Sequence, residues 1–150
     1  MRRGAAAAVL LGSLVALSGC QDLRDFAGTW SGPRVGGEHV RRGFGTGASA
    51  TLEVDGIDLD GISARLSTND DRFGRATIVA VPGAEADVLT SMTFDGSPLR
   101  VFLAFAETRD GGGDATAFIS LYSDDRIELR LLRGGDDPLY GIFTLTQTSD

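Results

Sequence analysis

The feature that most constrains this chain is an alternation of apolar and polar residues that recurs along its length. From Ala48 to Asp55 and from Ile62 to Ser67 every second side chain is apolar, and the segment from Arg126 to Leu131 repeats the pattern. A period of two places the apolar side chains on one face of a β-strand and the polar ones on the other. No segment after residue 19 shows a convincing 3.6-residue period of a helix, so the sequence predicts an all-β domain.

Further strands are predicted between and around these segments. The first begins at Gly28, and residues 90–95 alternate like the segments above. Three other segments are more continuously apolar, as expected for strands that are covered on both faces. They are Ala76 to Val81, Leu99 to Ala106 and Ala115 to Tyr122.

The breaks between the predicted strands are short and rich in turn-forming residues. They include Asp55-Gly56, Asp60-Gly61, Pro82-Gly83, Asp95-Gly96, Gly111-Gly112-Gly113 and Gly134 to Pro138. Connections this short join antiparallel neighbours, because parallel neighbours need long crossovers. We therefore expect an antiparallel meander of eight or nine strands that closes into a small up-and-down barrel, which leaves no exposed sheet edge. A two-sheet sandwich is the alternative.

The N-terminus has the composition of an export signal. Arg2 and Arg3 precede an apolar run from Ala5 to Leu17. Thirteen helical residues extend only ~20 Å, less than the ~30 Å of a hydrocarbon core. The sequence therefore predicts a cleaved signal helix over residues 1–19 rather than a permanent transmembrane anchor.

The apolar run ends in Leu17-Ser18-Gly19-Cys20, which resembles the lipobox of bacterial lipoproteins. The resemblance implies cleavage between Gly19 and Cys20 and attachment of a diacylglycerol to the Cys20 sulfur. Two or three acyl chains form a durable membrane anchor, since each buried methylene contributes ~0.8 kcal/mol. Cys20 is the only cysteine, so the fold contains no intramolecular disulfide.

The same resemblance implies a location in the bacterial cell envelope. In Gram-negative members, Asp directly after the lipidated cysteine favours retention at the inner membrane, and here that position is Gln21. We expect a periplasm-facing protein of the outer membrane in a Gram-negative source, and the outer face of the single membrane in a Gram-positive one. Residues 20–27 form a short tether and residues 28–150 the barrel domain.

The charge balance excludes one class of partner. The formal net charge of −7 becomes −9 when Arg2 and Arg3 leave with the signal. Nucleic-acid binding depends on clustered cations that displace counterions from phosphates. We therefore expect no nucleic-acid partner.

Gly28-Thr29-Trp30, at the start of the first predicted strand, resembles the Gly-x-Trp opening of the lipocalin and avidin barrels. In those families the tryptophan closes one end of the barrel, often beneath an arginine of a late strand. The resemblance offers Arg126, Arg130 and Arg133 as candidates for that arginine. The alternative is that Trp30 is an ordinary core residue of the first strand.

A glycine-rich stretch matches a nucleotide motif only in its letters. Residues 45–50, Gly-Thr-Gly-Ala-Ser-Ala, fit the pattern G-x-G-x-x-A. That site requires a helix after the glycines to receive the pyrophosphate. A predicted strand follows here, so we interpret the stretch as a loop.

Candidate metal and catalytic residues are few. Asp55, Asp58 and Asp60 precede Gly61, but Ser67 stands where a calcium-binding helix–loop–helix needs its glutamate. A looser calcium site between acidic turns is the alternative to ordinary turn chemistry. His39 is the only histidine, and no G-x-S-x-G elbow presents a serine to it. We therefore predict no catalytic residue, metal or cofactor.

These observations indicate a lipid-anchored, non-enzymatic binding domain. An eight-stranded barrel can enclose one small ligand, here a small apolar molecule, or be filled by its own side chains. In the second case the domain would be an envelope module that binds a protein or the cell wall. Phe102 and Phe105 fall on opposite faces of one predicted strand, so at least one of them points outward, either as an interaction patch for such a partner or on a face that the chain itself covers. A calcium-binding domain or a hydrolase is less favoured.

Overall fold

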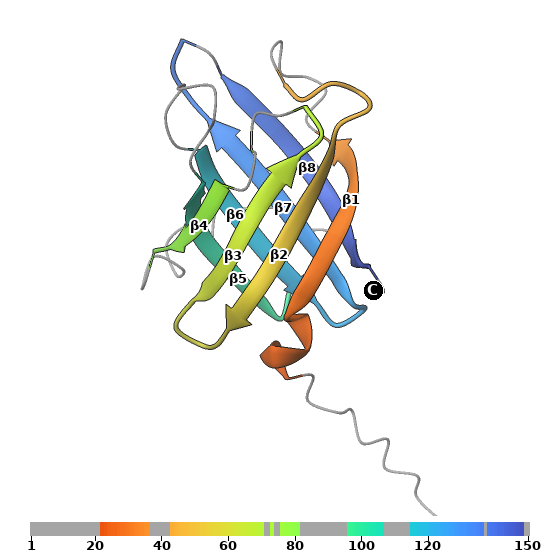
Figure 1. Cartoon of the computed structure of the whole chain (residues 1–150), viewed down its shortest axis with the longest axis vertical. Coiled ribbons are helices and arrows are strands. Elements are labelled where there is room, and N and C mark those ends of the chain that lie inside the picture. Colours follow the sequence, from red (N-terminus) through yellow and green to blue (C-terminus); the bar gives the residue numbers. More distant parts are fainter. Residues whose placement is uncertain are drawn as a thin grey trace, which may run out of the picture.

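The computed structural model describes residues 22–36, 43–70, 73, 76–81, 96–106, 115–136 and 138–148. In this part of the chain, eight antiparallel strands form a closed barrel in which each strand pairs with the next and β8 pairs back with β1 (Figure 1). The elements are η1 Leu23–Phe26, β1 Gly28–Gly36, β2 Ser49–Ile57, β3 Ile62–Thr68, β4 Ala76–Ala80, β5 Arg100–Ala106, β6 Ala115–Tyr122, β7 Arg126–Arg133 and β8 Leu139–Gln147. The predicted all-β meander and barrel are confirmed in place of the two-sheet sandwich. The strand predicted over 90–95 lies outside the described residues.

The alternation in the sequence becomes the two faces of the barrel wall. Trp30 on β1 pairs with Leu52 on β2, which in turn pairs with Leu66 on β3, and all three side chains are buried inside. The residues between them, such as Ser31 and Thr51, point outward and are partly exposed. Each fully buried large apolar side chain contributes about 1.5–3 kcal/mol to the free energy of folding. The apolar positions therefore define the inside of the barrel.

The expectation that three continuously apolar strands are covered on both faces is correct only in part. On β6, outward-facing Ser120 and Tyr122 are as buried as the inward residues. On β4, outward-facing Thr77 and Val79 are exposed. The prediction is wrong for β4 because β-branched residues favour strands on whichever face they lie.

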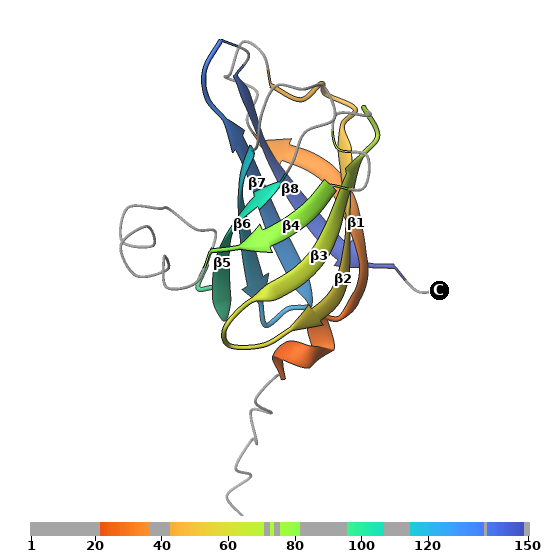
Figure 2. The same cartoon turned by 60° about the vertical axis from the view of Figure 1, so that its left-hand side comes forward.

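The shortest strand marks the weakest part of the barrel wall. Figure 2 shows β4 between β3 and β5. It has five residues, and its register with β5 contains three residue pairs, centred on Val79 and Phe105. The neighbouring β5–β6 ladder contains seven pairs. The wall therefore carries the fewest cross-strand contacts on either side of β4.

The end of the barrel that carries η1, called the lower end below, is closed by two stacked aromatic rings. The 3₁₀ turn η1 is capped by Asp22, whose carboxylate accepts a hydrogen bond from the Arg24 amide. Its last residue, Phe26, lies 5.5 Å from the Trp30 ring, and the Trp30 Nε1–H donates to the Phe26 carbonyl at 2.9 Å. Gly28 joins η1 to β1 with a φ of +123°, a conformation that glycine adopts without strain. The segment interpreted as a tether thus supplies part of the barrel core.

The opposite, upper end is closed by phenylalanines from loops. Phe44 lies between β1 and β2, and its ring meets the edge of Phe143 on β8 at 5.0 Å. Phe73, between β3 and β4, lies 6.1 Å from Phe44. Gly141 makes room for this packing, because a Cβ there would stand 2.6 Å from the Phe44 ring. All three phenylalanines are buried, so aromatic rings fill the barrel at both ends.

Candidate functional sites on the wall and at the lower end

The inside of the barrel is a packed core. Among the described strand residues, the inward side chains with no exposed surface at all are Leu52, Leu66, Ala104, Ala106, Ala115, Ala117, Ile119, Leu121, Ile127, Leu129, Leu131, Leu139, Phe143 and Leu145. No water molecule can touch these side chains, so no space large enough for a ligand adjoins them. The small alanines of β5 and β6 leave room for the larger leucines of β7 and β8. Interdigitation of small and large residues is the usual way to fill a small barrel.

The outer wall carries a line of apolar side chains, which we call the apolar row. Register places Val79, Phe105, Thr116, Leu132 and Tyr140 side by side across β4 to β8. The residues Val79, Phe105 and Leu132 are 59%, 44% and 47% exposed. Phe105 points outward while Phe102 on the same strand is buried, as the sequence predicted. Thr116 interrupts the row between Phe105 and Leu132, and exposed apolar side chains gathered in this way form a candidate interaction surface.

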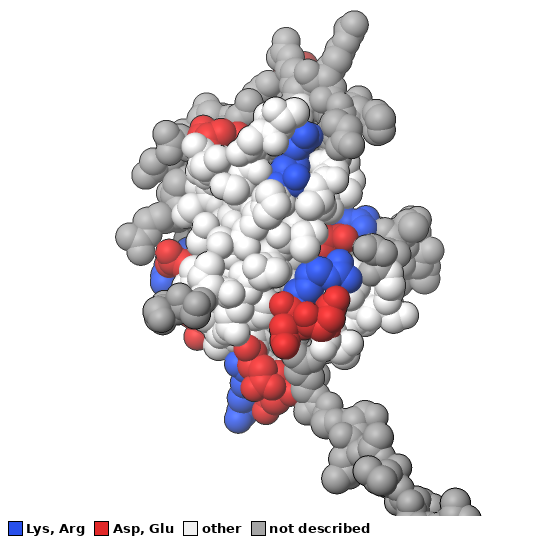
Figure 3. Space-filling model, turned by 90° about the vertical axis from the view of Figure 1, so that its right-hand side faces the viewer, with Lys and Arg blue, Asp and Glu red and all other residues white. Residues whose placement is uncertain are grey.

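Another part of the wall is charged. On β2 and β3, the Arg65 guanidinium binds Glu53 at 3.1 Å and Asp55 at 2.8 Å. The hydrogen bond to Glu53, followed by the charge of Asp55, raises the pKa of Arg65 above its ordinary value. Figure 3 shows that acidic and basic side chains also gather at the lower end of the face it presents. This charged cluster adjoins the β4 end of the apolar row, because Arg65 pairs with Thr77, two residues before Val79.

A buried polar cluster lies on the outer face of β6 and β7. The Arg130 Nε–H donates to Glu128 at 2.6 Å, and Glu128 lies opposite Ser120 in the ladder. Arg126 stacks over the Tyr122 ring at 3.9 Å. Ser120 is completely buried, so its hydroxyl is not an accessible nucleophile.

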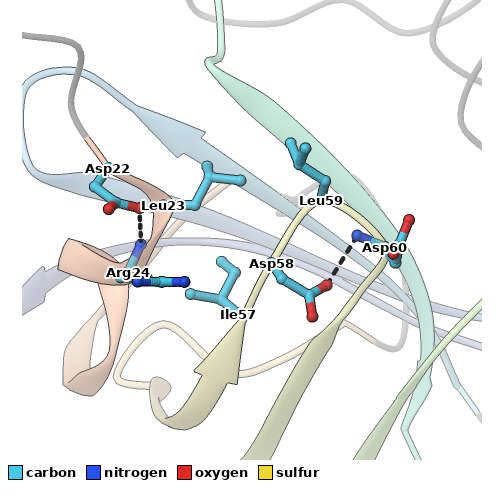
Figure 4. A pocket seen from close by; sticks show the side chains of 7 residues that line it. All are labelled: Asp22, Leu23, Arg24, Ile57, Asp58, Leu59 and Asp60. Carbon is cyan, nitrogen blue, oxygen red and sulfur yellow. Dashed lines mark hydrogen bonds between the residues drawn. The ribbon is translucent and has the colours of Figure 1, made fainter.

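The lower end is hollowed by a groove of about 610 Å³ between η1 and the β2–β3 turn. Figure 4 shows the apolar side chains of Leu23 and Ile57 between the two elements. The Asp58 carboxylate accepts hydrogen bonds from the amides of Asp60 and Gly61, at 2.8 and 2.9 Å. It therefore stabilises its own turn. Leu59, at the tip of this turn, is 70% exposed.

Several predicted residues fall outside this description. Gly19, Cys20 and His39 lie outside the described residues, so their predicted roles stay predictions.

The glycine-rich stretch forms a turn in which the Gly45 carbonyl accepts a hydrogen bond from the Ala48 amide at 3.0 Å. Strand β2 then begins at Ser49, so the helix that a nucleotide site requires is not there.

The three aspartates compared with a calcium loop are separated in their contacts. Asp55 binds Arg65, whereas Asp58 is turned toward the backbone of its own turn. Among the described residues, no three acidic, cysteine or histidine side chains come together as metal ligands. At the acidic turn after β3, Asp70 accepts a hydrogen bond from the Thr68 hydroxyl at 2.6 Å. This contact is turn chemistry of the kind expected for such residues.

The arginine sought for Trp30 is replaced by a phenylalanine. Phe26 stacks on the Trp30 ring. Of the three candidates, Arg126 lies over Tyr122 and Arg130 binds Glu128, both on the outer wall. Arg133 is buried at the end of β7, at the upper end of the barrel. The expected arginine contact is therefore wrong, because η1 already covers the tryptophan.

Sequence reasoning missed most of the apolar row and the groove. Of the row, only Phe105 was singled out. The other members were missed because they come from four other strands and meet Phe105 only through the register of the barrel. The groove depends on η1, which lies within the segment interpreted as a tether. The signal that could have found it is the pair Leu23 and Phe26, two large apolar residues in a mostly polar stretch.

Comparison with known proteins adds no relative. No family model matches this chain, and neither a curated protein nor a solved structure is significantly similar to it. Within the described part of the chain, no helix is long and apolar enough to cross a bilayer. The fold and the surface of the barrel are therefore the basis for a function.

Proposed function

We propose that this protein is an exported lipoprotein, anchored in the bacterial envelope by acyl chains on Cys20, whose barrel is a non-enzymatic module that binds a partner protein through its outer wall. The observation that carries the binding mode is the packed interior, in which fourteen inward side chains have no exposed surface. The lipobox-like sequence Leu17-Ser18-Gly19-Cys20 carries the anchoring. The preferred location remains the periplasmic side of an outer membrane.

The packing disfavours the small apolar ligand that the sequence left open. A ligand inside the barrel would have to displace residues such as Ile119 and Leu129, which have no free space beside them. It would also have to pass Phe26 and Trp30 at one end, or Phe44 and Phe73 at the other. Ligand sites in barrels are ordinarily preformed cavities of ≈300 Å³ or more. The outer wall is the better binding surface.

The apolar row favours a concave partner. Neighbouring strands lie ≈4.8 Å apart, so the row extends about 19 Å around a convex wall. Two copies of a convex wall would touch only along a narrow line, which argues against self-association through this face. A partner protein with an apolar groove fits the row better than a second barrel.

Cys20→Ser tests the anchoring. We expect the unmodified chain to be cut before Cys20 and to carry the mass of its acyl groups, as measured by intact mass spectrometry of the membrane fraction. The Cys20→Ser variant should accumulate as an uncut precursor without added mass. Normal cleavage of the variant would contradict the proposal.

A photo-crosslinking amino acid at position 105 tests the binding surface in living cells. We expect it to form a discrete crosslinked product with one protein, whereas the same amino acid at position 51, on the polar wall of β2, should not. Equal products from both positions would argue against the apolar row. A native mass spectrum that shows an apolar molecule bound to the barrel would favour the interior ligand instead.

A further inference from the structure

We propose that the lower end of the barrel rests on the bilayer surface, with Leu59 and Leu99 in contact with zwitterionic phospholipid. This inference rests on the proposed lipid anchor and deepens it, because it assigns which end of the molecule meets the membrane. The partner is a lipid surface, and it differs from the protein partner of the apolar row.

The length of chain between the anchor and the barrel limits the orientation. Cys20 is two residues before Asp22, the first described residue. Two extended residues span at most ~7 Å, so the lipid attachment point lies close to the Asp22 backbone. Asp22 itself lines the groove at the lower end (Figure 4). Acyl chains that enter the bilayer from this point bring the lower end against it.

A barrel that stands on its lower end holds its upper end away from the same surface. Strand β1 has nine residues, which at ≈3.3 Å per residue and a typical barrel tilt rise about 20 Å along the axis. The upper end of β1, where Val35 is 56% exposed, is thus several times farther from Asp22 than the free chain extends. The short connection therefore always keeps the lower end at the membrane, and Val35 reaches the bilayer only if the barrel lies on its side, which equal quenching at positions 59 and 35 would show.

The lower end exposes apolar side chains at the expected place. Leu59, at the tip of the β2–β3 turn, is the most exposed large apolar side chain among the described residues, at 70%. Leu99, directly before β5, is 46% exposed. The two are linked, because the Arg100 Nη2–H donates to the Leu59 carbonyl at 2.6 Å. Exposed leucines gain free energy when they enter the boundary between headgroups and acyl chains, because their apolar surface leaves water.

Carboxylates surround these leucines, among them exposed Asp60 directly after Leu59, and they favour a neutral over an anionic lipid surface. The carboxylates of Asp22 and Asp58 are engaged with amides of their own segments, which holds them close to the backbone. The net charge of −9 after removal of the leader repels the whole domain from anionic lipid. We therefore specify phosphatidylcholine as the test surface.

Leu59→Trp in the full chain tests the contact directly. The processed protein is reconstituted into phosphatidylcholine vesicles with or without lipid brominated near the headgroup, and tryptophan fluorescence is recorded. We expect bromine to lower the fluorescence that Trp at position 59 adds by at least twofold. Val35→Trp is the matched control, since it places the same side chain at the upper end, where no quenching is expected. Native Trp30 is buried and gives a constant background that the unmodified protein measures.

The outcomes separate this inference from the proposed function. If the protein floats with the vesicles and carries acyl mass, but positions 59 and 35 are quenched equally or position 59 is not quenched, the orientation is wrong and the anchor stands. If the purified protein has no acyl mass and does not float, the anchor fails and the orientation fails with it. Selective quenching at position 59 in the floating protein supports both.

Discussion

The two ends of the barrel are closed by the same kind of side chain but from different distances along the sequence. At the lower end, Phe26 and Trp30 are four residues apart, and a hydrogen bond between them fixes their stacking. At the upper end, Phe44 comes from the first loop and Phe143 from the last strand. We call the Phe26–Trp30 pair the lower plug and the cluster of Phe44, Phe73 and Phe143 the upper plug. The lower plug is local in sequence, whereas the upper plug depends on closure of the whole barrel.

The two plugs connect different parts of the molecule. The lower plug continues directly into the residues that lead to the proposed anchor, so it links the membrane attachment to the barrel core. The upper plug is formed only when β8 is in place beside β1, because Phe44 packs over Gly141. Variants at the two ends can therefore be compared as a local and a long-range contribution to stability.

The largest effect is expected for Trp30→Ala, which removes the lower plug. Loss of a buried tryptophan destabilises a domain by about 3–5 kcal/mol, because the transfer free energy is lost and a cavity remains. Urea denaturation followed by circular dichroism measures the change.

Trp30→Phe is the matched control for that variant. It keeps a ring against Phe26 but loses the 2.9 Å hydrogen bond to the Phe26 carbonyl, so a smaller loss of about 1 kcal/mol or somewhat more is expected. If the alanine variant were no less stable than the phenylalanine variant, the lower plug would not be a main contributor.

Gly141→Ala overpacks the upper plug. The new methyl group would stand 2.6 Å from the Phe44 ring, which must shift, at a cost of about 1–3 kcal/mol. Gly45→Ala, in the loop at the same end, is the control, since no atom lies within 4 Å of the Cβ there.

A double-mutant cycle sharpens this result. Leucine at position 44 is shorter than phenylalanine and relieves the contact, so Gly141→Ala should cost less in a Phe44→Leu background. If the changes in the free energy of unfolding caused by Gly141→Ala and Phe44→Leu simply add, then a part of the structure other than the Phe44 ring moves to make room for the new methyl group.

The sequence predicted the strands well where burial follows the alternation. The segments from 48 to 55 and from 62 to 67 correspond to β2 and β3 within about two residues, because each apolar position is also an inward position. For β4 the pattern of residue types and the pattern of burial differ, so the burial of that strand was predicted wrongly.

The upper plug and the apolar row could not be predicted in the same way. Whether Phe44 turns inward depends on the space that Gly141 leaves nearly a hundred residues later. Val79 and Leu132 become part of one row only through the registers of three intervening ladders. The lower plug was closer to prediction, because Gly28-Thr29-Trp30 pointed to a tryptophan at a barrel end, although not to Phe26 as its partner.

Gly28→Ala probes the turn that connects η1 to the barrel. Its φ of +123° is strained for any residue with a Cβ, and the new atom would also stand 3.2 Å from the Gln147 amide nitrogen. A loss of about 1–2 kcal/mol is expected. Gly134→Ala, beyond the end of β7, has open space and should leave the urea midpoint almost unchanged. Similar losses at both positions would remove the argument that the backbone at Gly28 requires glycine.

The smallest effect is expected on the wall between the two ends, where Glu53 and Asp55 hold Arg65. Glu53→Gln removes one charge from an exposed network, and exposed ion pairs contribute little because solvent screens them. The raised pKa of Arg65 means that its guanidinium remains charged at every pH below its folded value, so alkali in the ordinary range does not weaken the pair and salt does. The difference in urea midpoint between the variant and the unmodified protein should therefore be small at low ionic strength. It should disappear near 1 M salt, where the screening length falls to about 3 Å. A large, salt-independent loss would place a main source of stability on the charged wall, and the two aromatic plugs would then no longer explain what holds the barrel closed.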